Sequence, residues 1–340
     1  MVRLTYEGTV PNAIRTATLT TGTVNVAYPW VGDPLVVPYP SEVIDVTAKT
    51  PAQISTEYTE KITWFNTVNF TGASVSDWVN YLPLNIPEGK TVEWEATVNG
   101  NVSMSVILLM SASRGTFIVK GGSIQNSGGG SSIHSDSPGT IIVSGGTVRH
   151  TANGVAISNK GNGTVNVTDG LVTSATNSTT FGTIENDGTG KINVSGGTVS
   201  NTSTGVSIWN AGAGTVVTVS GTAVVSATTS ADGAIRNVST GTINIEGGTV
   251  TSAITTSTSG TIRNSSAGGT VNVSGGIVQN TATSNVNRRA IHSNNDNGVI
   301  NVTGGVVQLT EGAPNYDGIT SAIRGGTINV TPPGVVIPWN

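Results

Sequence analysis

Valine and isoleucine occupy every second position in short segments that recur from Gly115 to the end of the chain. This alternation is typical of a β-strand with one buried face. Consecutive repeats start 24 to 29 residues apart, as in GTIIVSGGTVRH from Gly139, GTVNVTDGLVTS from Gly163 and GKINVSGGTVSN from Gly190. A repeat of this length built from strands predicts a solenoid, in which each turn buries its apolar face against its neighbours.

Each repeat contains three short extended pieces separated by glycine-rich corners, with the patterns GT[IV]NV[ST], GTVx[NS] and x[AS]IxN. Glycine adopts the positive φ angles that sharp corners need. No part of the repeat has apolar residues at the 3.6-residue spacing of a helix. We therefore predict an all-β, right-handed parallel β-helix with three strands in each coil, because parallel crossovers strongly prefer this hand. With coils stacked about 4.8 Å apart, we expect about nine of them.

The first part of the chain has a different composition, since residues 1–114 hold four of the six tryptophans and five of the six tyrosines. The proline-rich segment 27–45 is typical of an extended arm. Segment 61–84 is expected to form strands that close the end of the solenoid. We divide the chain into an N-terminal arm and cap of β and loop structure at 1–87 and a β-helix at 88–340. Within the latter, 88–114 is an irregular first coil and 115–340 holds the regular repeats; the arm packs either on its own rod or on a neighbour.

Apolar side chains near both ends of the chain are candidates for joining one rod to the next. The last coil ends in VVIPWN, and the proline-rich arm contains a tryptophan. An apolar tip on a stackable rod favours head-to-tail contacts, which do not close and give filaments. The alternative is that these residues fold over the end of their own rod. The candidate assembly residues are Trp30, Val335, Val336, Ile337 and Trp339.

Outward positions of the first strand form one column of threonines and a second column of asparagines. Stacked Asn and Thr side chains are expected to satisfy one another along the rod. A regular face of this kind also fits an ice-binding protein, although Lys191, Val216, Glu246 and Val299 interrupt it.

The third strand has an outward column whose residues differ from one repeat to the next. It contains aromatic, cationic and imidazole groups, which are suited to recognising a carbohydrate or a protein. The alternative is a solvated face without a partner. The candidate binding residues are His134, Glu185, Trp209, Arg236, Arg263, His292 and Arg324.

Composition narrows the classes of function. The net charge is −4 and no basic stripe exists to neutralise phosphates, so nucleic acid is not expected as a partner. The chain has no cysteine, which removes disulfides and thiol chemistry, and no apolar run long enough to span a bilayer. Acidic residues of the repeats form no pair in adjacent coils, and the three histidines lack a metal-binding spacing. We therefore expect no catalytic residues, no metal and no cofactor.

The phrase G-T-[IV]-N-V-S-G-G-T-V-x-N, followed by A-I-x-N, resembles the repeats of bacterial extracellular right-handed β-helix proteins of the pectate-lyase-like superfamily, of the adhesin or surface-protein type. The resemblance covers Gly115 to Val330 and implies an extracellular or cell-surface location. The clustered acidic and basic residues of the superfamily's enzymes are not found here. We expect a non-enzymatic structural or adhesive solenoid that self-assembles head to tail into a surface filament, with copies of itself and glycans as partners.

Two alternatives remain open. Phage tail spikes share this fold, so a carbohydrate-binding spike on a virion or cell surface is the first. An ice-binding protein that uses the Thr and Asn face is the second. The first ten residues contain no apolar segment typical of a signal peptide. This fits either a leader that was removed or release by lysis, as for phage structural proteins.

Overall fold

The structure is a computed structural model that describes residues 15–19, 22–26, 41–228, 232–255, 258–283, 288–294, 296–310 and 322–337. The chain forms two compact units, Met1–Pro38 and Tyr39–Asn340. In the first unit, β1 (Arg15–Leu19) and β2 (Gly22–Val26) form an antiparallel pair. Most of the predicted arm, including Trp30, lies outside the described residues.

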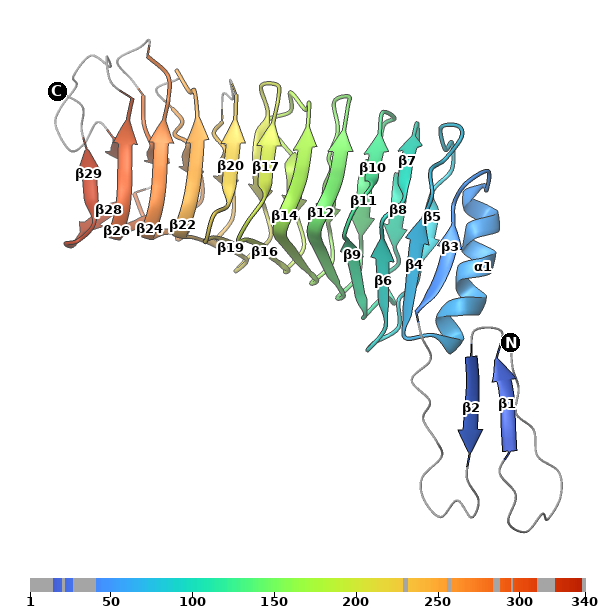
Figure 1. Cartoon of the computed structure of the whole chain (residues 1–340). Helices are drawn as coiled ribbons and strands as arrows, with labels where there is room; N and C mark the ends of the chain where they lie inside the picture. The colour runs from blue at the N-terminus through green and yellow to red at the C-terminus, as the bar shows by residue number, and fades with distance from the viewer. Residues whose placement is uncertain are drawn as a thin grey trace. The chain divides into compact units, whose positions relative to one another are not determined.

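The second unit is a right-handed parallel β-helix of about 11 turns, which confirms the predicted fold class (Figure 1). Two more turns are present than the repeats predict, because the parallel ladder already begins at β3 (Glu42–Asp45) and continues through β4 (Thr67–Thr71) and β6 (Thr91–Trp94). The ladder thus starts well before residue 88, where the sequence places the β-helix. In these early coils Phe70 and Trp94 occupy the inward positions that later coils give to valine and isoleucine, so the repeat is hidden in the sequence.

The regular coils contribute strands to three faces of the solenoid, and the first two faces share one sheet of 17 strands. Five long strands run through the corner between these two faces: β12 (Thr140–His150), β14 (Thr164–Ser174), β22 (Thr242–Ser252), β24 (Thr270–Asn280) and β26 (Val299–Leu309). The other strands of the first face are β3, β4, β6, β9 (Thr116–Val119), β16 (Lys191–Val194), β19 (Val216–Val219) and β28 (Thr327–Val330). Those of the second face are β7 (Thr97–Gly100), β10 (Ser123–Asn126), β17 (Thr198–Asn201), β20 (Val224–Ala227) and β29 (Val335–Ile337).

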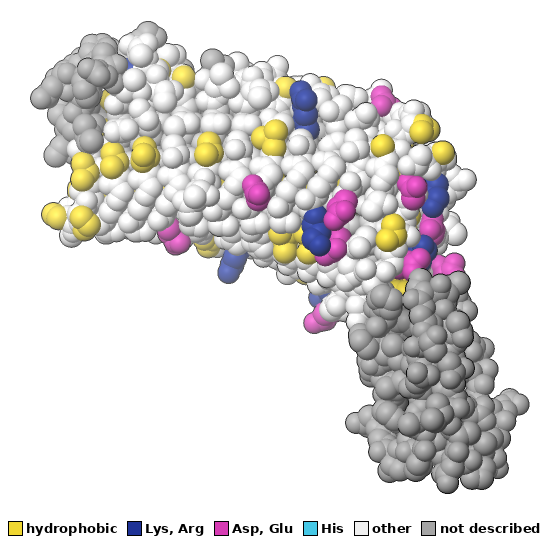
Figure 2. All heavy atoms as spheres, viewed as in Figure 1, with side chains coloured by type: hydrophobic (Ala, Val, Ile, Leu, Met, Phe, Trp, Pro, Cys, Tyr) yellow, Lys and Arg dark blue, Asp and Glu magenta, His cyan; other side chains and the backbone are white. Residues whose placement is uncertain are grey.

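The third face is a separate sheet of ten parallel strands. Its strands are β5 (Leu82–Leu84), β8 (Ser105–Leu109), β11 (Ser131–Ser135), β13 (Ile157–Asn159), β15 (Gly182–Asn186), β18 (Val206–Asn210), β21 (Ile235–Asn237), β23 (Ile262–Asn264), β25 (Ile291–Ser293) and β27 (Ile323–Arg324). All pairings in this sheet are parallel, so each position of one strand lies beside the same position of the next coil. Seen from one side, the surface of the solenoid carries few and scattered charges (Figure 2).

The corner between the first and second faces requires glycine for two reasons. Gly305 has a φ of +68°, in the left-handed region that glycine tolerates best. A Cβ atom at this position would also lie 2.5 Å from the carbonyl oxygen of Gly275 in the preceding coil. The corner glycine therefore sets both the turn of the chain and the close approach of adjacent coils.

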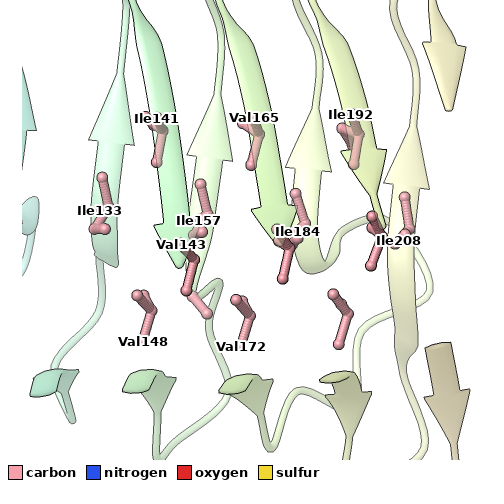
Figure 3. Packing of buried hydrophobic residues seen from close by; sticks show 14 of the residues in the cluster. Ile133, Ile141, Val143, Val148, Ile157, Val165, Val172, Ile184, Ile192 and Ile208 are labelled. Atoms are coloured by element: carbon pink, nitrogen blue, oxygen red, sulfur yellow. The ribbon is translucent and has the colours of Figure 1, made fainter. Parts of the chain in front are cut away.

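The core consists of aliphatic columns that run through the coils (Figure 3). One column of the first face contains Ile141, Val165, Ile192, Val217, Ile243, Val271 and Ile300, none of them more than 1% exposed. Burying one such side chain stabilises a fold by roughly 1.5–3 kcal/mol. Because this stack uses residues of similar volume, successive strands of the first face pair without a change of register.

The N-terminal end of this core is covered by helix α1 (Pro51–Trp64). A capping box between Thr50 and Gln53 begins the helix, and its buried face contains Ile54, Tyr58 and Ile62 at helical spacing. The Tyr58 hydroxyl donates a 2.8 Å hydrogen bond to the carbonyl of Asn85. The sequence analysis did not predict this helix: of segment 61–84, β4 and β5 are strands as expected, but the first four residues belong to α1. Within the described residues, no helix is long and apolar enough to cross a membrane.

Candidate functional site: the third-face column

The residues predicted to form a variable column lie beside one another on successive strands of the third face. The pairing register links His134 to Ser158, Ser158 to Glu185, Glu185 to Trp209, Trp209 to Arg236, Arg236 to Arg263, Arg263 to His292 and His292 to Arg324. We call these eight residues the third-face column. Each one directly follows a buried isoleucine of its own strand. The hydrophobic core therefore fixes the position of each column residue, and we call each of these positions a rung.

An internal ladder of asparagines, which the sequence analysis missed, lies next to this column. Asn159, Asn186, Asn210, Asn237 and Asn264 are buried and directly follow the column residues in their strands. Each side-chain amide donates to the side-chain oxygen of the next, over 2.9 to 3.1 Å. The recurring final asparagine of the A-I-x-N phrase was the signal in the sequence. These hydrogen bonds hold the corner after the column in place.

The N-terminal half of the column contains polar contacts near the surface. His134 Nε2 lies 3.0 Å from Asp136 Oδ1. Glu185 accepts a 2.9 Å hydrogen bond from the Ser158 hydroxyl and lies 3.3 Å from Lys160 Nζ. Burial lowers the pKa of Lys160, but its hydrogen bond to Asp187 and the charges of both carboxylates outweigh this and raise the pKa. The pair between Lys160 and Asp187, in which both side chains are more than a third exposed, contributes little to stability.

The centre of the column is covered rather than open. The Arg236 guanidinium lies over the Trp209 ring, 4.7 Å from its centroid, and only 8% of Trp209 is exposed. Arg236 Nη1 donates to Asp232 Oδ2 over 2.6 Å and to the carbonyl of Thr179 over 2.7 Å. The Trp209 ring, a predicted binding group, is therefore a platform for Arg236 in this conformation and is not open to a sugar ring.

Asp232 bridges two neighbouring rungs, since Arg263 Nη1 also donates to its carboxylate. The sequence analysis did not single out Asp232, which precedes β21 and lies outside the strand pattern. Burial lowers the pKa of both arginines, yet both stay cationic, as arginine does in proteins. Among the described residues, the Nε atoms of Arg236 and Arg263 are buried without a hydrogen-bond partner.

The C-terminal part of the column is basic. His292 is 7% exposed, and burial is the main cause that lowers its pKa to about 4; the charges of Arg324, Arg263 and Arg289 act in the same direction, against a hydrogen bond with the Thr258 backbone. The imidazole is thus neutral at pH 7. Arg324, on the next rung, is exposed to solvent.

The first-face columns have the geometry that the sequence predicts. Side-chain amides join Asn193 to Asn166, Asn272 to Asn244, Asn301 to Asn272 and Asn329 to Asn301, over 2.7 to 2.9 Å. The same register brings Lys191 beside Val216, and Val299 lies between two threonines of the neighbouring coils. These three side chains interrupt the regular array that an ice-binding face requires.

The C-terminal end of the solenoid exposes aliphatic side chains. Val330 lies in the inward-facing column that is buried in the preceding coils, yet it is 41% exposed, and Val335 is 44% exposed. Val336 is partly buried against the core, the backbone of Ile337 belongs to β29, and Trp339 lies outside the described residues. Val335 also continues an outward row with Ile277 and Val306 on the second face, and hydrophobic side chains form a row on this part of the surface in Figure 2.

Within the described part of the chain, no group of three or more His, Cys, Asp or Glu side chains is placed to hold a metal ion. No protein-family model, no curated protein and no solved structure matches the chain.

Proposed function

We propose that this chain is a non-enzymatic, extracellular structural and adhesive β-solenoid whose third-face column contacts the surface to which it adheres. The observation that carries this proposal is the contrast between faces. The first face repeats Thr and Asn with few interruptions, whereas the third-face column changes from rung to rung between histidine, serine, glutamate, tryptophan and arginine. A rigid backbone ladder that carries a non-repeating set of side chains is suited to recognition.

Two further features support an adhesive role. The repeats resemble those of pectate-lyase-like β-helix proteins of the adhesin type, which favours a cell-surface location. The exposed valines of the C-terminal end favour self-assembly through that end. Assembly into a filament through this end is part of the proposal.

A second candidate is a carbohydrate-binding spike, and the arginines of the third-face column favour it. The two functions differ in the particle that carries the solenoid, which is a cell in one and a virion in the other. Contact with a glycan is common to both. Arg236, Arg263 and Arg324 therefore serve as the first residues to test under either proposal.

The proposal is tested by incubating the purified protein with a panel of extracellular polysaccharides and measuring both retention on the polymer and the length of the polymer afterwards. We expect retention on at least one polymer with no change in its length distribution. Progressive shortening of the polymer would show a glycan-cleaving enzyme and would overturn the non-enzymatic proposal. A protein retained on no polymer and on no cell surface would remove the adhesive part.

A further inference from the structure

We infer that strand β2 of one molecule adds to the open C-terminal edge of a second copy of the chain, beside β28, and so joins two solenoids. This inference rests on the self-assembly in the proposed function and names the segment that forms the joint. When a strand is added to the edge of a sheet, backbone hydrogen bonds supply affinity, and the side chains that alternate along the strand supply specificity.

β2 carries the sequence of a first-face strand. It reads GTVNV, which is identical to the segments from Gly163 and from Gly269 that lead into β14 and β24. It differs by a single residue from GTINV, the segment from Gly326 that contains β28. Within the described residues, however, β2 pairs with β1 in a two-stranded antiparallel sheet of its own. An isolated pair of strands is only marginally stable in water, so addition to a larger sheet stabilises it.

The acceptor is the edge of β28, the last strand of the first face at the C-terminal end (Figure 1). β28 pairs with β26 on one side, and its other side is the end of the first face. Val330 lies in an inward column and is 41% exposed, whereas Val302 at the same position of the preceding coil is fully buried. This edge therefore presents backbone groups and an apolar side chain that a further strand would cover.

The ladder of first-face asparagines gives the register of the added strand. Side-chain amides donate toward the preceding coil, and the last one, Asn329, donates to Asn301 over 2.7 Å. The side-chain oxygen of Asn329 is thus the acceptor that the next asparagine of the ladder would use. A parallel β2 that continues the register places Asn25 beside Asn329 and Val26 over Val330.

The N-terminal end of the β-helix is closed to the same addition. β3 is the first strand of the ladder, and Lys61 of α1 donates a 2.8 Å hydrogen bond to the carbonyl of Val43 in this strand. The same Lys61 Nζ lies 2.8 Å from Glu42 Oε1. A lysine at an edge strand and a helix packed against it both oppose pairing with another strand. The open edge is therefore the one at β28.

The length of chain between β2 and β3 favours a second copy as the acceptor. Residues 27–41 connect the two strands, and sixteen Cα-to-Cα steps span at most about 58 Å when fully extended. A strand added beyond β28 lies twelve first-face spacings from β3, which is also about 58 Å. The four prolines in this segment favour a shorter rise of about 3.1 Å per residue, which gives about 50 Å. The connection therefore reaches another molecule, and it keeps α1 of the donor near the C-terminal end of the acceptor.

Introduced cysteines test the joint directly, because the chain has none of its own. The Asn25→Cys and Asn329→Cys proteins are mixed without reductant, and linked dimers are identified by non-reducing electrophoresis and peptide mass spectrometry. Neighbouring strands lie about 4.8 Å apart, which a disulfide can bridge. We expect at least about fivefold more of the mixed dimer than from Asn25→Cys with Asn301→Cys, the matched control, since Asn301 lies one coil further away.

Val26→Asp tests the apolar contact of the joint. It places a carboxylate against Val330 and should raise the protein concentration at half-maximal assembly about tenfold or more, as measured by analytical ultracentrifugation. Thr23→Asp is the matched control, because the same change falls on the outward row of the added strand. It should assemble within about twofold of the parent protein.

Equal cross-linking at Asn329 and Asn301 would overturn the inference while leaving self-assembly intact, as would equal assembly of the Val26 and Thr23 variants. A disulfide within single molecules of the double variant Asn25→Cys with Asn329→Cys would overturn it as well, because β2 would then cover its own solenoid. A parent protein that stays single at every concentration would instead contradict the self-assembly of the proposed function, so the two failures are distinguishable.

Discussion

Asp232 is the residue on which the basic half of the third-face column depends. It is 6% exposed and accepts hydrogen bonds from Arg236 and Arg263, two rungs of the same column. Like charges on neighbouring rungs repel one another, and their burial is tolerated only when an opposite charge lies between them. A single carboxylate thus allows two cations to stack where a solvated face would have kept them apart.

Replacing Asp232 with asparagine should lower the free energy of unfolding by about 2–4 kcal/mol, because it leaves two mostly buried guanidinium groups without their shared counter-charge. Urea denaturation measures the change. Asp187→Asn is the control: Asp187 pairs with Lys160 at the surface, where both side chains are more than a third exposed, and the expected loss is at most about 1 kcal/mol. Equal losses in the two variants would contradict the bridging role of Asp232.

His292 makes stability depend on pH. Its pKa of about 4 in the folded chain lies below the ordinary value of 6.5, so between these values the unfolded chain binds more protons. Stability should therefore rise from pH 4 to pH 6.5 and fall as the solution is acidified through this window. The shift corresponds to roughly 3 kcal/mol at most.

His292→Gln should flatten this part of the stability profile, as measured by urea denaturation at several pH values between 4 and 7. The same substitution at His134, whose ring lies in the more exposed half of the column, is the control. If both variants keep the slope of the parent protein, His292 does not cause it.

At the scale of strands, two asparagine ladders hold the coils in register, one buried inside the solenoid and one at its surface. The internal ladder through Asn210 is fully buried, and its amide groups pair with one another and with backbone carbonyls at the corner. The outer ladder through Asn272 lies at the partly exposed surface of the first face. Water can replace a lost partner only in the outer ladder, so equal hydrogen bonds have unequal effects on stability.

Asn210→Ala should therefore destabilise the solenoid by about 2–4 kcal/mol, since it leaves buried groups of Asn186, Asn237 and Thr215 without their partner and opens a small cavity. Asn272→Ala removes a similar pair of hydrogen bonds at the surface and should cost about 1 kcal/mol or less. Thermal and urea unfolding compare the two variants. A loss at Asn272 as large as that at Asn210 would show that burial does not set the difference.

For the solenoid as a whole, the two ends of the β-helix differ. Helix α1 covers the N-terminal end of the core and turns a polar side, with Thr56, Thr59 and Glu60, away from it. The C-terminal end leaves Val330 and Val335 more than 40% exposed on the last described strands. A head-to-tail joint would seat this aliphatic end against the outer surface of α1 of the next molecule, and repetition of such a contact gives a filament.

The double variant Val330→Lys with Val335→Lys should abolish assembly, which electron microscopy over a concentration series and analytical ultracentrifugation measure. Lysine places a charge where the joint would be dry. The control is Val75→Lys with Val79→Lys, which changes two valines that are 74% and 71% exposed outside the C-terminal end. Single rods of the parent protein at every concentration would contradict assembly through this end.

Prediction from the sequence succeeded where one short pattern repeats. The alternation of Val and Ile fixes the register, so the column from His134 to Arg324 could be aligned without a structure. It failed in the early coils, because Phe70 and Trp94 replace the aliphatic residues and obscure the period. It also missed α1, although Thr50, Gln53 and the spacing of Ile54, Tyr58 and Ile62 carried the signal, because a single helix has no repeat that reinforces this signal.

The sequence by itself determined the parallel β-helix and the coil on which each column residue lies. The reason is that strand alternation and glycine corners are local patterns that recur in every repeat. Only the tertiary structure decided that Trp209 lies beneath Arg236, that Asp232 bridges two arginines, and that α1 covers one end of the core. These contacts join loops and helices to strands of other coils. Such contacts depend on how segments distant in the sequence pack together, and the repeat pattern does not encode this packing.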